Sequence, residues 1–328
     1  MMENLICCEQ VKKMTNLEYN LLEKKWEITG RNNSCMPYTP IISGYHIYVA
    51  LEDNILSCFS LNGEEEKIGL INKYHNSKYG ILFSKNNTIY DANYNVHTLC
   101  DVDFATCDNH IYSCCNFLNS QMVIKYDIEK KKAICKSKLF KPEINIKCND
   151  KAIIIFNIDG LTVLSLDLNV IKEIPISNLE NIDIYQNLIC LASSSKLNQT
   201  NLSLFDTKGN SIWTQLLSGN ILNVVMGDFI YCSTDSFLYC LDKKGEIIWS
   251  KNPTSSLAYF IDKTEHILVV YDKTINIYES ETGILVWQSH ISHPVCGEPG
   301  ISNKGIVICT YNDGGIHFFG RSNLWENF

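Results

Sequence analysis

Four residues in the last fifth of the chain have side chains of the kinds that bind zinc. The stretch HISHPVCGEP contains His290, His293, Cys296 and Glu298, which offer imidazole, thiolate and carboxylate ligands. Their spacing matches no closed structural zinc pattern, and PVCGEP also resembles an ordinary strand, as SCMPYTP does at 34–40. Two interpretations therefore stay open: a divalent metal site at these four residues, or the crossover into the inner strand of a sheet.

Cysteine pairs are the second group of reactive residues. Cys114 and Cys115 are adjacent in HIYSCCNFLN, and Cys7 and Cys8 are adjacent near the start. Side chains alternate along a strand, so Cys114 and Cys115 should point to opposite faces. Most of the fifteen cysteines lie in strand-like runs, and we expect buried free thiols rather than a disulfide framework. Catalytic residues are not identified by any local motif.

A repeat supplies the elements that position these residues. Five turn aspartates follow one another at intervals of 36, 40, 39 and 36 residues, namely Asp91, Asp127, Asp167, Asp206 and Asp242. Four tryptophans follow at intervals of 36, 38 and 38 residues, namely Trp213, Trp249, Trp287 and Trp325. A period near 38 built from strands predicts a propeller or a solenoid.

One copy of the repeat shows its internal order most clearly. GDFIYCSTDSFLYCLDKKGEIIW predicts strands at 229–233, 237–241 and 246–250, separated by tight turns. The apolar segment ILNVVM upstream predicts an innermost fourth strand. A lone four-stranded sheet has two faces to cover, and stacking such sheets as blades in a ring buries both.

The length of the repeated region sets the number of blades. Trp26 and Trp325 are 299 residues apart, so the observed spacings favour eight blades, with seven as the alternative. The weak point is the second copy, which has only 29 residues from Asn62 to Asp91. We expect residues near 20–28 to pair with the last blade and close the ring. The predicted fold is thus all-β: a single β-propeller over 19–328, preceded by an N-terminal extension over 1–18.

The unit YCLDKKGEIIW resembles the repeat of the quinoprotein-like (PQQ-like) β-propellers. The resemblance covers about residues 20–325 and is strongest in the last four copies. It implies that Trp213, Trp249 and Trp287 pack as spacers between neighbouring blades. It does not imply the quinone, because quinone-dependent members are much longer and place a vicinal disulfide and a calcium ion in the central funnel. We expect no cofactor, pyrroloquinoline quinone included, and a divalent metal only under the first interpretation above.

Charge argues against several classes of partner. The net charge is −8 and the lysines are scattered, apart from EKKKAICKSK at 129–138, so no broad basic face is available for nucleic acid or for an anionic membrane. The start MMENLICCEQVKK lacks the apolar core of a signal peptide, and no segment is apolar for the length of a membrane helix. We expect a cytoplasmic protein.

These patterns favour a non-catalytic scaffold, a monomer that binds a protein or peptide partner through its loop faces. KLNQTN at 196–201 lengthens one hairpin and is a candidate contact loop, and residues 1–18 form either a short docking helix or a frayed terminus. The alternative is an enzyme or a small-ligand-binding protein that uses the central funnel, with or without a metal at His290, His293, Cys296 and Glu298.

Overall fold

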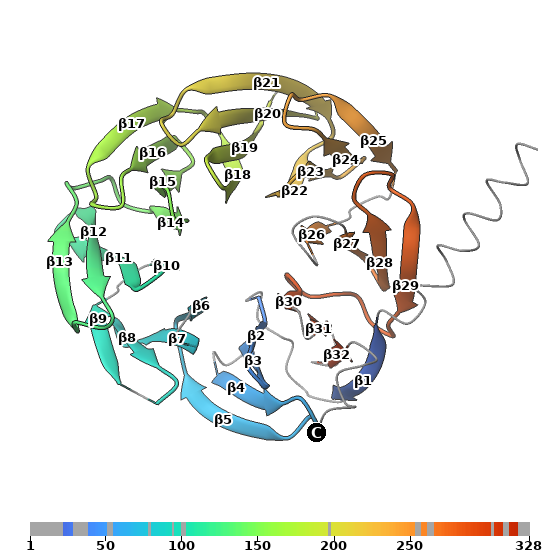
Figure 1. Ribbon diagram of the computed structural model, residues 1–328, viewed down its shortest axis with the longest axis horizontal. Coiled ribbons are helices and arrows are strands. Elements are labelled where there is room, and N and C mark those ends of the chain that lie inside the picture. The colour runs from blue at the N-terminus through green and yellow to red at the C-terminus, as the bar shows by residue number, and fades with distance from the viewer. Residues whose placement is uncertain are drawn as a thin grey trace, which may run out of the picture. The chain divides into compact units, whose positions relative to one another are not determined.

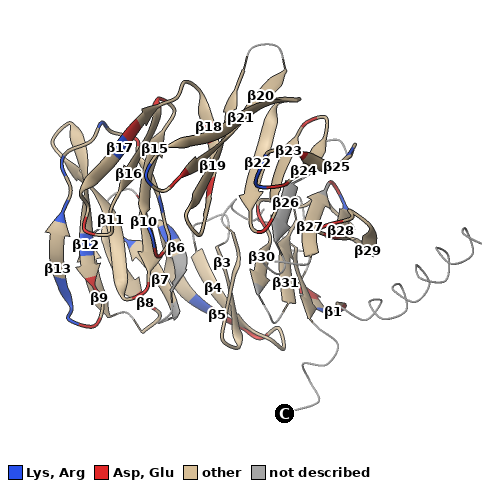
Figure 2. Ribbon diagram, turned by 45° about the horizontal axis from the view of Figure 1, so that its top comes forward, with Lys and Arg blue, Asp and Glu red and all other residues tan. Residues whose placement is uncertain are grey.

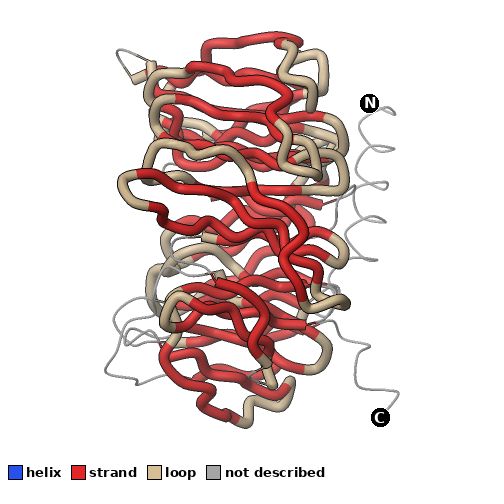
Figure 3. Tube along the Cα trace, turned by 90° about the vertical axis from the view of Figure 1, so that its left-hand side faces the viewer, coloured by secondary structure: helices blue, strands red, loops and turns tan. Residues whose placement is uncertain are grey.

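The computed structural model describes residues 22–28, 39–50, 55–77, 80–93, 95–99, 103–195, 198–252, 257–260, 266–302, 305–310 and 315–320. Within these ranges all regular structure is β-strand (Figure 3), and no helix there is long and apolar enough to cross a membrane. The extension over 1–18, Cys7, Cys8 and Trp325 lie outside the described residues.

Eight four-stranded antiparallel sheets make up the fold, which is that of an eight-bladed β-propeller (Figure 1). The seven-blade alternative is therefore wrong. The short second copy still holds four strands because two of them have only four residues each. Contacts divide the chain into two compact units, one of Met1–Glu52, Ser57–Lys67 and Leu257–Phe328 and the other of Asp53–Leu56 and Ile68–Ser256.

The first unit holds most of three blades, numbered 1, 7 and 8. Blade 1 consists of β2 (Ile41–Ser43), β3 (His46–Ala50), β4 (Ile55–Ser60) and β5 (Glu65–Leu70). Blade 7 consists of β26 (Leu257–Phe260), β27 (His266–Tyr271), β28 (Thr274–Glu279) and β29 (Leu285–His290). Blade 8 consists of β30 (Gly300–Ser302), β31 (Gly305–Cys309), β32 (Ile316–Gly320) and, as its outer strand, β1 (Glu23–Ile28). The register Lys24↔Phe319 confirms the predicted pairing of residues 20–28 with the last blade.

The second unit holds five blades, numbered 2 to 6. Blade 2 has β6 (Lys73–Ser77), β7 (Gly80–Lys85), β8 (Thr88–Asp91) and β9 (Val96–Leu99), and blade 3 has β10 (Phe104–Cys107), β11 (His110–Phe117), β12 (Ser120–Asp127) and β13 (Lys132–Lys136). Blade 4 has β14 (Asn145–Cys148), β15 (Ile153–Asn157), β16 (Gly160–Leu164) and β17 (Val170–Pro175). Blade 5 has β18 (Leu179–Tyr185), β19 (Leu188–Ser194), β20 (Gln199–Asp206) and β21 (Ser211–Ser218), and blade 6 has β22 (Ile221–Met226), β23 (Ile230–Thr234), β24 (Leu238–Leu241) and β25 (Ile247–Lys251). The four strands predicted for blade 6 are confirmed to within one residue.

Apolar cores lie between neighbouring blades of the same unit. Cys190 and Leu204 of blade 5 pack with Val224 and Cys232 of blade 6, and similar layers join blades 3 to 4 and 4 to 5. The outermost strands are mixed, with exposed apolar side chains such as Ile134 and Ile247 beside charged ones. The outer strand β13 carries exposed Lys132 and Lys136 (Figure 2), charges that discourage pairing of this free edge with another chain.

The repeated aspartates hold the turn between the third and fourth strands of a blade. Asp206 Oδ1 accepts hydrogen bonds from the backbone N–H groups of Lys208 (2.9 Å) and Asn210 (2.8 Å), and Asp242 does the same in blade 6. In blade 4 the equivalent residue is Ser165, whose Oγ accepts from the N–H groups of Asp167 (3.3 Å) and Asn169 (3.2 Å). Counting Asp167 as the turn aspartate of this blade was therefore wrong by two residues.

Tryptophans join neighbouring blades in the way that the resemblance implies. Trp213 of blade 5 donates its indole N–H to the carbonyl of Lys243 in the blade 6 turn (3.0 Å), and its ring lies over Gly245. A Cβ at Gly245 would lie 3.1 Å from that ring, and the residue has φ +91°. Both the close ring and the backbone conformation therefore favour glycine at this position. Trp26 repeats this contact with Leu61 and Gly63 of blade 1.

The other two predicted spacers differ from each other. Trp287 of blade 7 is buried and meets Phe319 of blade 8 edge to face, with ring centroids 5.9 Å apart, which confirms it as a spacer. Trp249 contacts Tyr231 of its own blade, at 5.8 Å between centroids.

Blades 3 and 4 meet without a tryptophan. Cys135 is paired with Lys125 beside the bulge, as Trp213 is paired with Leu204, so a cysteine stands at the tryptophan position. Its thiol donates to the carbonyl of Asp167 (3.7 Å) in the blade 4 turn. Tyr112 of β11 donates its hydroxyl to the carbonyl of Leu166 (3.2 Å), the equivalent of the carbonyl that Trp213 contacts in blade 6.

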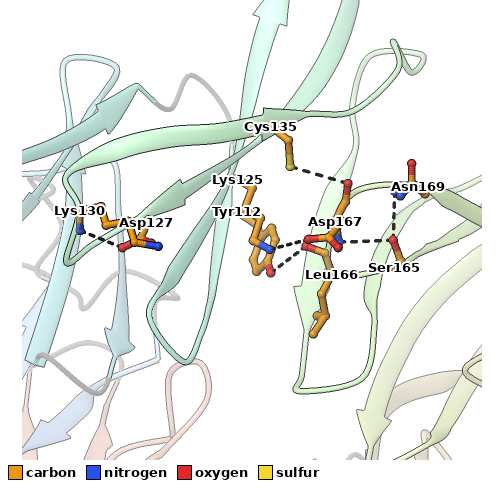
Figure 4. A network of polar contacts seen from close by, with 9 residues as sticks. All are labelled: Tyr112, Lys125, Asp127, Lys130, Cys135, Ser165, Leu166, Asp167 and Asn169. Atoms are coloured by element: carbon orange, nitrogen blue, oxygen red, sulfur yellow. Dashed lines mark hydrogen bonds and ion pairs between the residues drawn. The ribbon is translucent and has the colours of Figure 1, made fainter.

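An ion pair completes this polar interface (Figure 4). Buried Lys125 places its Nζ 2.9 Å from Oδ1 of Asp167, whose side chain is 76% exposed. The glycine position of the turn is taken by Leu168, which is buried and has φ +65°. Non-glycine residues rarely adopt this conformation, so the turn keeps the backbone shape of the repeat at some cost in strain.

Candidate functional site

Three of the four predicted metal ligands make separate contacts within the first unit, and His293 is partly buried in the bend after β29. His290 ends β29 opposite Thr274, and its Nδ1 lies 3.3 Å from the Thr274 hydroxyl. Glu298 accepts a hydrogen bond from the Thr39 hydroxyl (2.7 Å). Cys296 is buried in the core between blades 8 and 1, and its backbone N–H donates to the carbonyl of Cys309 (2.8 Å).

The structure does not bring these four side chains together. In the ranges given above, which include His290, His293, Cys296 and Glu298, no three His, Cys, Asp or Glu side chains are grouped closely enough to hold a metal ion. Metal binding by this segment stays a prediction from sequence. Cys114 and Cys115 are both buried and outside any disulfide, with Cys114 in the core between blades 3 and 4.

A groove lies on blades 3 and 4 of the second unit. It has a volume of about 570 Å³ and lies between the connection 137–144, which leads from β13 to β14, and strands β15 to β17. Its lining combines apolar side chains with a charged rim, namely Leu139, Phe140, Phe156 and Ile174 with Lys138, Lys141, Asp159 and Glu173.

The first wall is fixed by Gln121 at the start of β12. Phe140 and Gln121 exchange both backbone hydrogen bonds, at 2.9 and 2.7 Å. The side-chain carbonyl of Gln121 also accepts from the N–H of Ile144 (3.0 Å), and its amide donates to Asn116 (2.9 Å). The connection 137–144 is therefore tied to blade 3 in its middle, at Phe140, and at its end, at Ile144, so the wall is preformed.

The second wall depends on Gly160, the first residue of β16. This glycine has φ +145° and faces Pro175 in β17, where a Cβ would lie 2.4 Å from the carbonyl of Ile174. Any side chain here would push β17 away. The close approach of the two strands gives the groove a firm edge.

Apolar side chains stand exposed at the mouth of the groove. Leu139 is 48% exposed, and Ile158, in the β15–β16 turn beside the groove, is 63% exposed. Water contact with such side chains is unfavourable, so a partner that covers them gains stability on binding. Phe140 is held on one side by the ammonium group of Lys138, 5.6 Å from the ring centroid.

Charges surround the apolar surface. Lys138 pairs with Glu173, and Lys141 Nζ lies 3.7 Å from Oδ2 of Asp159. A second concavity of about 610 Å³ adjoins the groove, shares Lys141 and Asp159 with it, and adds Glu143 and Glu180. Four carboxylates against two lysines leave this surface with a net negative charge.

The neighbouring hairpin of blade 3 presents two more apolar side chains at the same end of the blades. Leu118, at the tip of the β11–β12 turn, is 92% exposed and has φ +56°, and Phe117 beside it is 49% exposed. A leucine is a poor residue for a left-handed turn, where asparagine or glycine is preferred. Neither turn geometry nor burial accounts for leucine here.

Sequence reasoning missed this surface. It pointed instead to the hairpin over 196–201, whose residues 196 and 197 lie outside the described ranges. The available signal was an apolar residue inside a turn: Leu118 in FLNS is followed by two turn-forming residues, and Ile158 in NIDG has turn-forming residues on both sides.

Comparisons with known proteins show the fold alone. No protein-family model matches the chain, and no curated protein matches its sequence. Among solved structures, the chain is similar to the computationally designed protein Ika8, with a TM-score of 0.73 and 10% identity over 91% of this chain and 99% of that one. It is similar to BamB from Moraxella catarrhalis, with a TM-score of 0.67 and 12% identity over 92% and 98% of the two chains. The Dos1 propeller aligns with a TM-score of 0.66 and 10% identity over 91% and 95%.

Proposed function

We propose that this protein is a non-catalytic scaffold whose groove on blades 3 and 4 binds an extended peptide segment of a partner protein. One observation carries the proposal: a groove with two fixed walls has exposed Leu139 in its lining, and exposed Ile158 lines the concavity that adjoins it. Peptides that bind in this way gain affinity from a few apolar anchors seated in preformed pockets.

The rim charges define the partner further. Glu143, Asp159, Glu173 and Glu180 outnumber Lys138 and Lys141, so the matching segment carries an apolar anchor flanked by lysine or arginine. Leu118 and Phe117 extend the contact surface toward blade 3.

Other features support a cytoplasmic location and blades of the PQQ-like type. None of the eleven cysteines in the described ranges is in a disulfide, as is usual in a reducing compartment. The Trp213–Gly245 contact and the likeness to BamB fit the PQQ-like repeat.

A peptide selection tests the proposal directly. A phage-displayed library of random peptides is selected on the immobilised full chain, and the enriched peptides are synthesised and titrated. We expect an apolar residue next to Lys or Arg in these peptides. We expect at least tenfold weaker binding to Leu139→Asp and Ile158→Asp, a loss of about 1.4 kcal/mol or more.

Ile247→Asp provides the matched control. Ile247 lies on β25 and is 45% exposed, so the same change is made at a similar exposure far along the chain. Binding should survive in this variant, and all three proteins should melt close to the wild type because the altered side chains are exposed. If the enriched peptides bind Leu139→Asp and Ile158→Asp as tightly as the wild type, the groove is not the binding site.

A further inference from the structure

Two thiols meet where the inner strands of blades 3 and 4 end. Cys107 is the last residue of β10 and Cys148 is the last residue of β14. These two strands pack against each other, and both side chains lie against the same core between the blades. The two thiols lie within reach of a hydrogen bond to each other, neither is in a disulfide, and both residues are partly exposed.

The two thiols are chemically unequal. The hydrogen bond from Cys148 lowers the pKa of the Cys107 thiol below its usual value. The same hydrogen bond, together with burial, raises the pKa of Cys148. Cys107 is therefore the readier to become a thiolate, the form that attacks electrophiles, while Cys148 keeps its proton and donates it.

Other thiols of the second unit are placed differently. Cys190 and Cys232 are fully buried in the core between blades 5 and 6, and burial raises the pKa of Cys232 to about 12. Cys135 is partly exposed but donates its S–H to the carbonyl of Asp167. Access to water together with a neighbouring thiol distinguishes Cys107 and Cys148 from these three.

We propose that Cys107 and Cys148 form a reversible disulfide between blades 3 and 4 when the protein meets hydrogen peroxide. The Cys107 thiolate attacks one peroxide oxygen, so an S–O bond forms, the O–O bond breaks, and hydroxide leaves and takes up a proton to become water. Cys148 then attacks the sulfur of the resulting sulfenic acid, so an S–S bond forms and a second water leaves. Two thiols and one peroxide thus give one disulfide and two waters, and a small thiol reverses the reaction by exchange.

This site is separate from the proposed peptide groove. Cys107 is followed by the turn into β11, whereas the groove and Leu118 lie at the other end of β11 and β12. The disulfide would close a loop of about 40 residues, which restricts the unfolded chain and stabilises the folded one.

Mass spectrometry of the full chain tests the proposal. The protein is treated with a small molar excess of hydrogen peroxide, alkylated and digested without reductant. We expect a cross-linked pair of peptides that contain Cys107 and Cys148, lighter by two hydrogen atoms than the two separate peptides and split by dithiothreitol. We also expect the oxidised wild type to melt at a higher temperature than the oxidised Cys107→Ser variant.

Single variants identify the role of each thiol. Cys148→Ser should accumulate a sulfenic acid on Cys107 that a dimedone probe traps, and Cys107→Ser should leave Cys148 reduced at the same peroxide dose. Cys135→Ser, the matched control nearby, should form the cross-link as the wild type does, and circular dichroism checks that every variant is folded. A wild type in which Cys107 is oxidised with no link to Cys148, or a Cys107→Ser variant in which Cys148 oxidises equally fast, would overturn the proposal.

Discussion

Two interfaces between blades satisfy the same carbonyl of the turn with different side chains. One joins blades 5 and 6, and the other joins blades 3 and 4. In the first, Trp213 covers Gly245 and donates one hydrogen bond to the turn. In the second, Tyr112 donates the equivalent hydrogen bond from a different strand, and buried Lys125 pairs with Asp167. The carbonyl at this place in the turn finds a donor in both, so the donor is the constant requirement and tryptophan is one way to meet it.

Features beyond packing gather at blades 3 and 4, although the outer strands of blades 1, 2 and 4 lack a tryptophan as that of blade 3 does. The groove, the exposed Leu118 and the Cys107–Cys148 pair all belong to blades 3 and 4. Residues that depart from the local sequence preferences of a fold without improving its packing or turn geometry are typical of functional positions. The regular blade 6 turn, by contrast, is accounted for by turn geometry and packing.

The largest effect is expected at the tryptophan contact. Trp213→Ala removes a large, partly buried ring and one hydrogen bond, and should lower the free energy of unfolding by about 2–3 kcal/mol. Gly245→Ala forces an alanine into φ +91° against the same ring and should cost about 1–2 kcal/mol. Chemical denaturation of both variants and of the double variant measures this. If the loss of stability in the double variant equals the sum of the losses in the two single variants, the two residues do not act as one contact.

Leu168→Gly has two opposing effects on stability at the interface between blades 3 and 4. Glycine relieves the strain of φ +65°, a gain of about 1 kcal/mol, but loses a buried side chain that contributes about 2–3 kcal/mol. The loss of burial outweighs the relief of strain, so the variant should be less stable by about 1–2 kcal/mol in urea denaturation. A more stable variant would mean that this turn is a strained copy of the blade 6 turn and nothing more.

Tyr112→Phe tests the replacement donor alone. The phenyl ring keeps the packing, while the carbonyl of Leu166 loses the tyrosine hydroxyl, at an expected cost of about 1 kcal/mol. Tyr239→Phe is the matched control, since the Tyr239 hydroxyl donates to the carbonyl of Ser218 (3.3 Å) at an interface that already has Trp213. Thermal melts should show the smaller shift for Tyr239→Phe, and equal shifts would remove the special role of Tyr112.

The smallest effect is expected at Asp167 and depends on pH. The hydrogen bond and charge of Lys125 lower the pKa of Asp167 in the folded protein. A lowered pKa contributes stability above the unfolded value of about 4, and that contribution is lost as the pH falls through the folded value. The wild type should therefore be more stable than Asp167→Asn near neutral pH, and the difference should vanish in acid. Denaturation at several pH values measures this, and a difference that is independent of pH would exclude the ion pair as its cause.

The sequence was sufficient for the blades but not for the contacts that replace the repeat. Trp213, Trp287 and Trp26 carry a periodic signal because each repeat must bury the same surface. Ser165 was missed because a serine and an aspartate both hold this turn, and Asp167 two residues later offered a false match. Tyr112 could not be found, since it reaches the turn from another strand and leaves no local pattern.

The candidate sites show the same limit. His290 and Glu298 are close in sequence, but a strand end and a crossover direct them to Thr274 and Thr39. The groove forms between a connection and the blade after it, so no single segment encodes it. Cys107 and Cys148 are 41 residues apart along the chain, about one repeat, and only the stacking of β10 on β14 brings them together.

The outer strand of blade 8 has a consequence for how the chain is made. β1 pairs with β32, so strands almost 300 residues apart have to find each other, and a contact at such a separation forms late and slowly. Until the last blade has been synthesised, β1 has no strand to pair with. At a high local concentration of chains it can therefore pair with β32 of a second chain instead. Dimers in which two chains have exchanged β1 are therefore the misfolded product expected during synthesis.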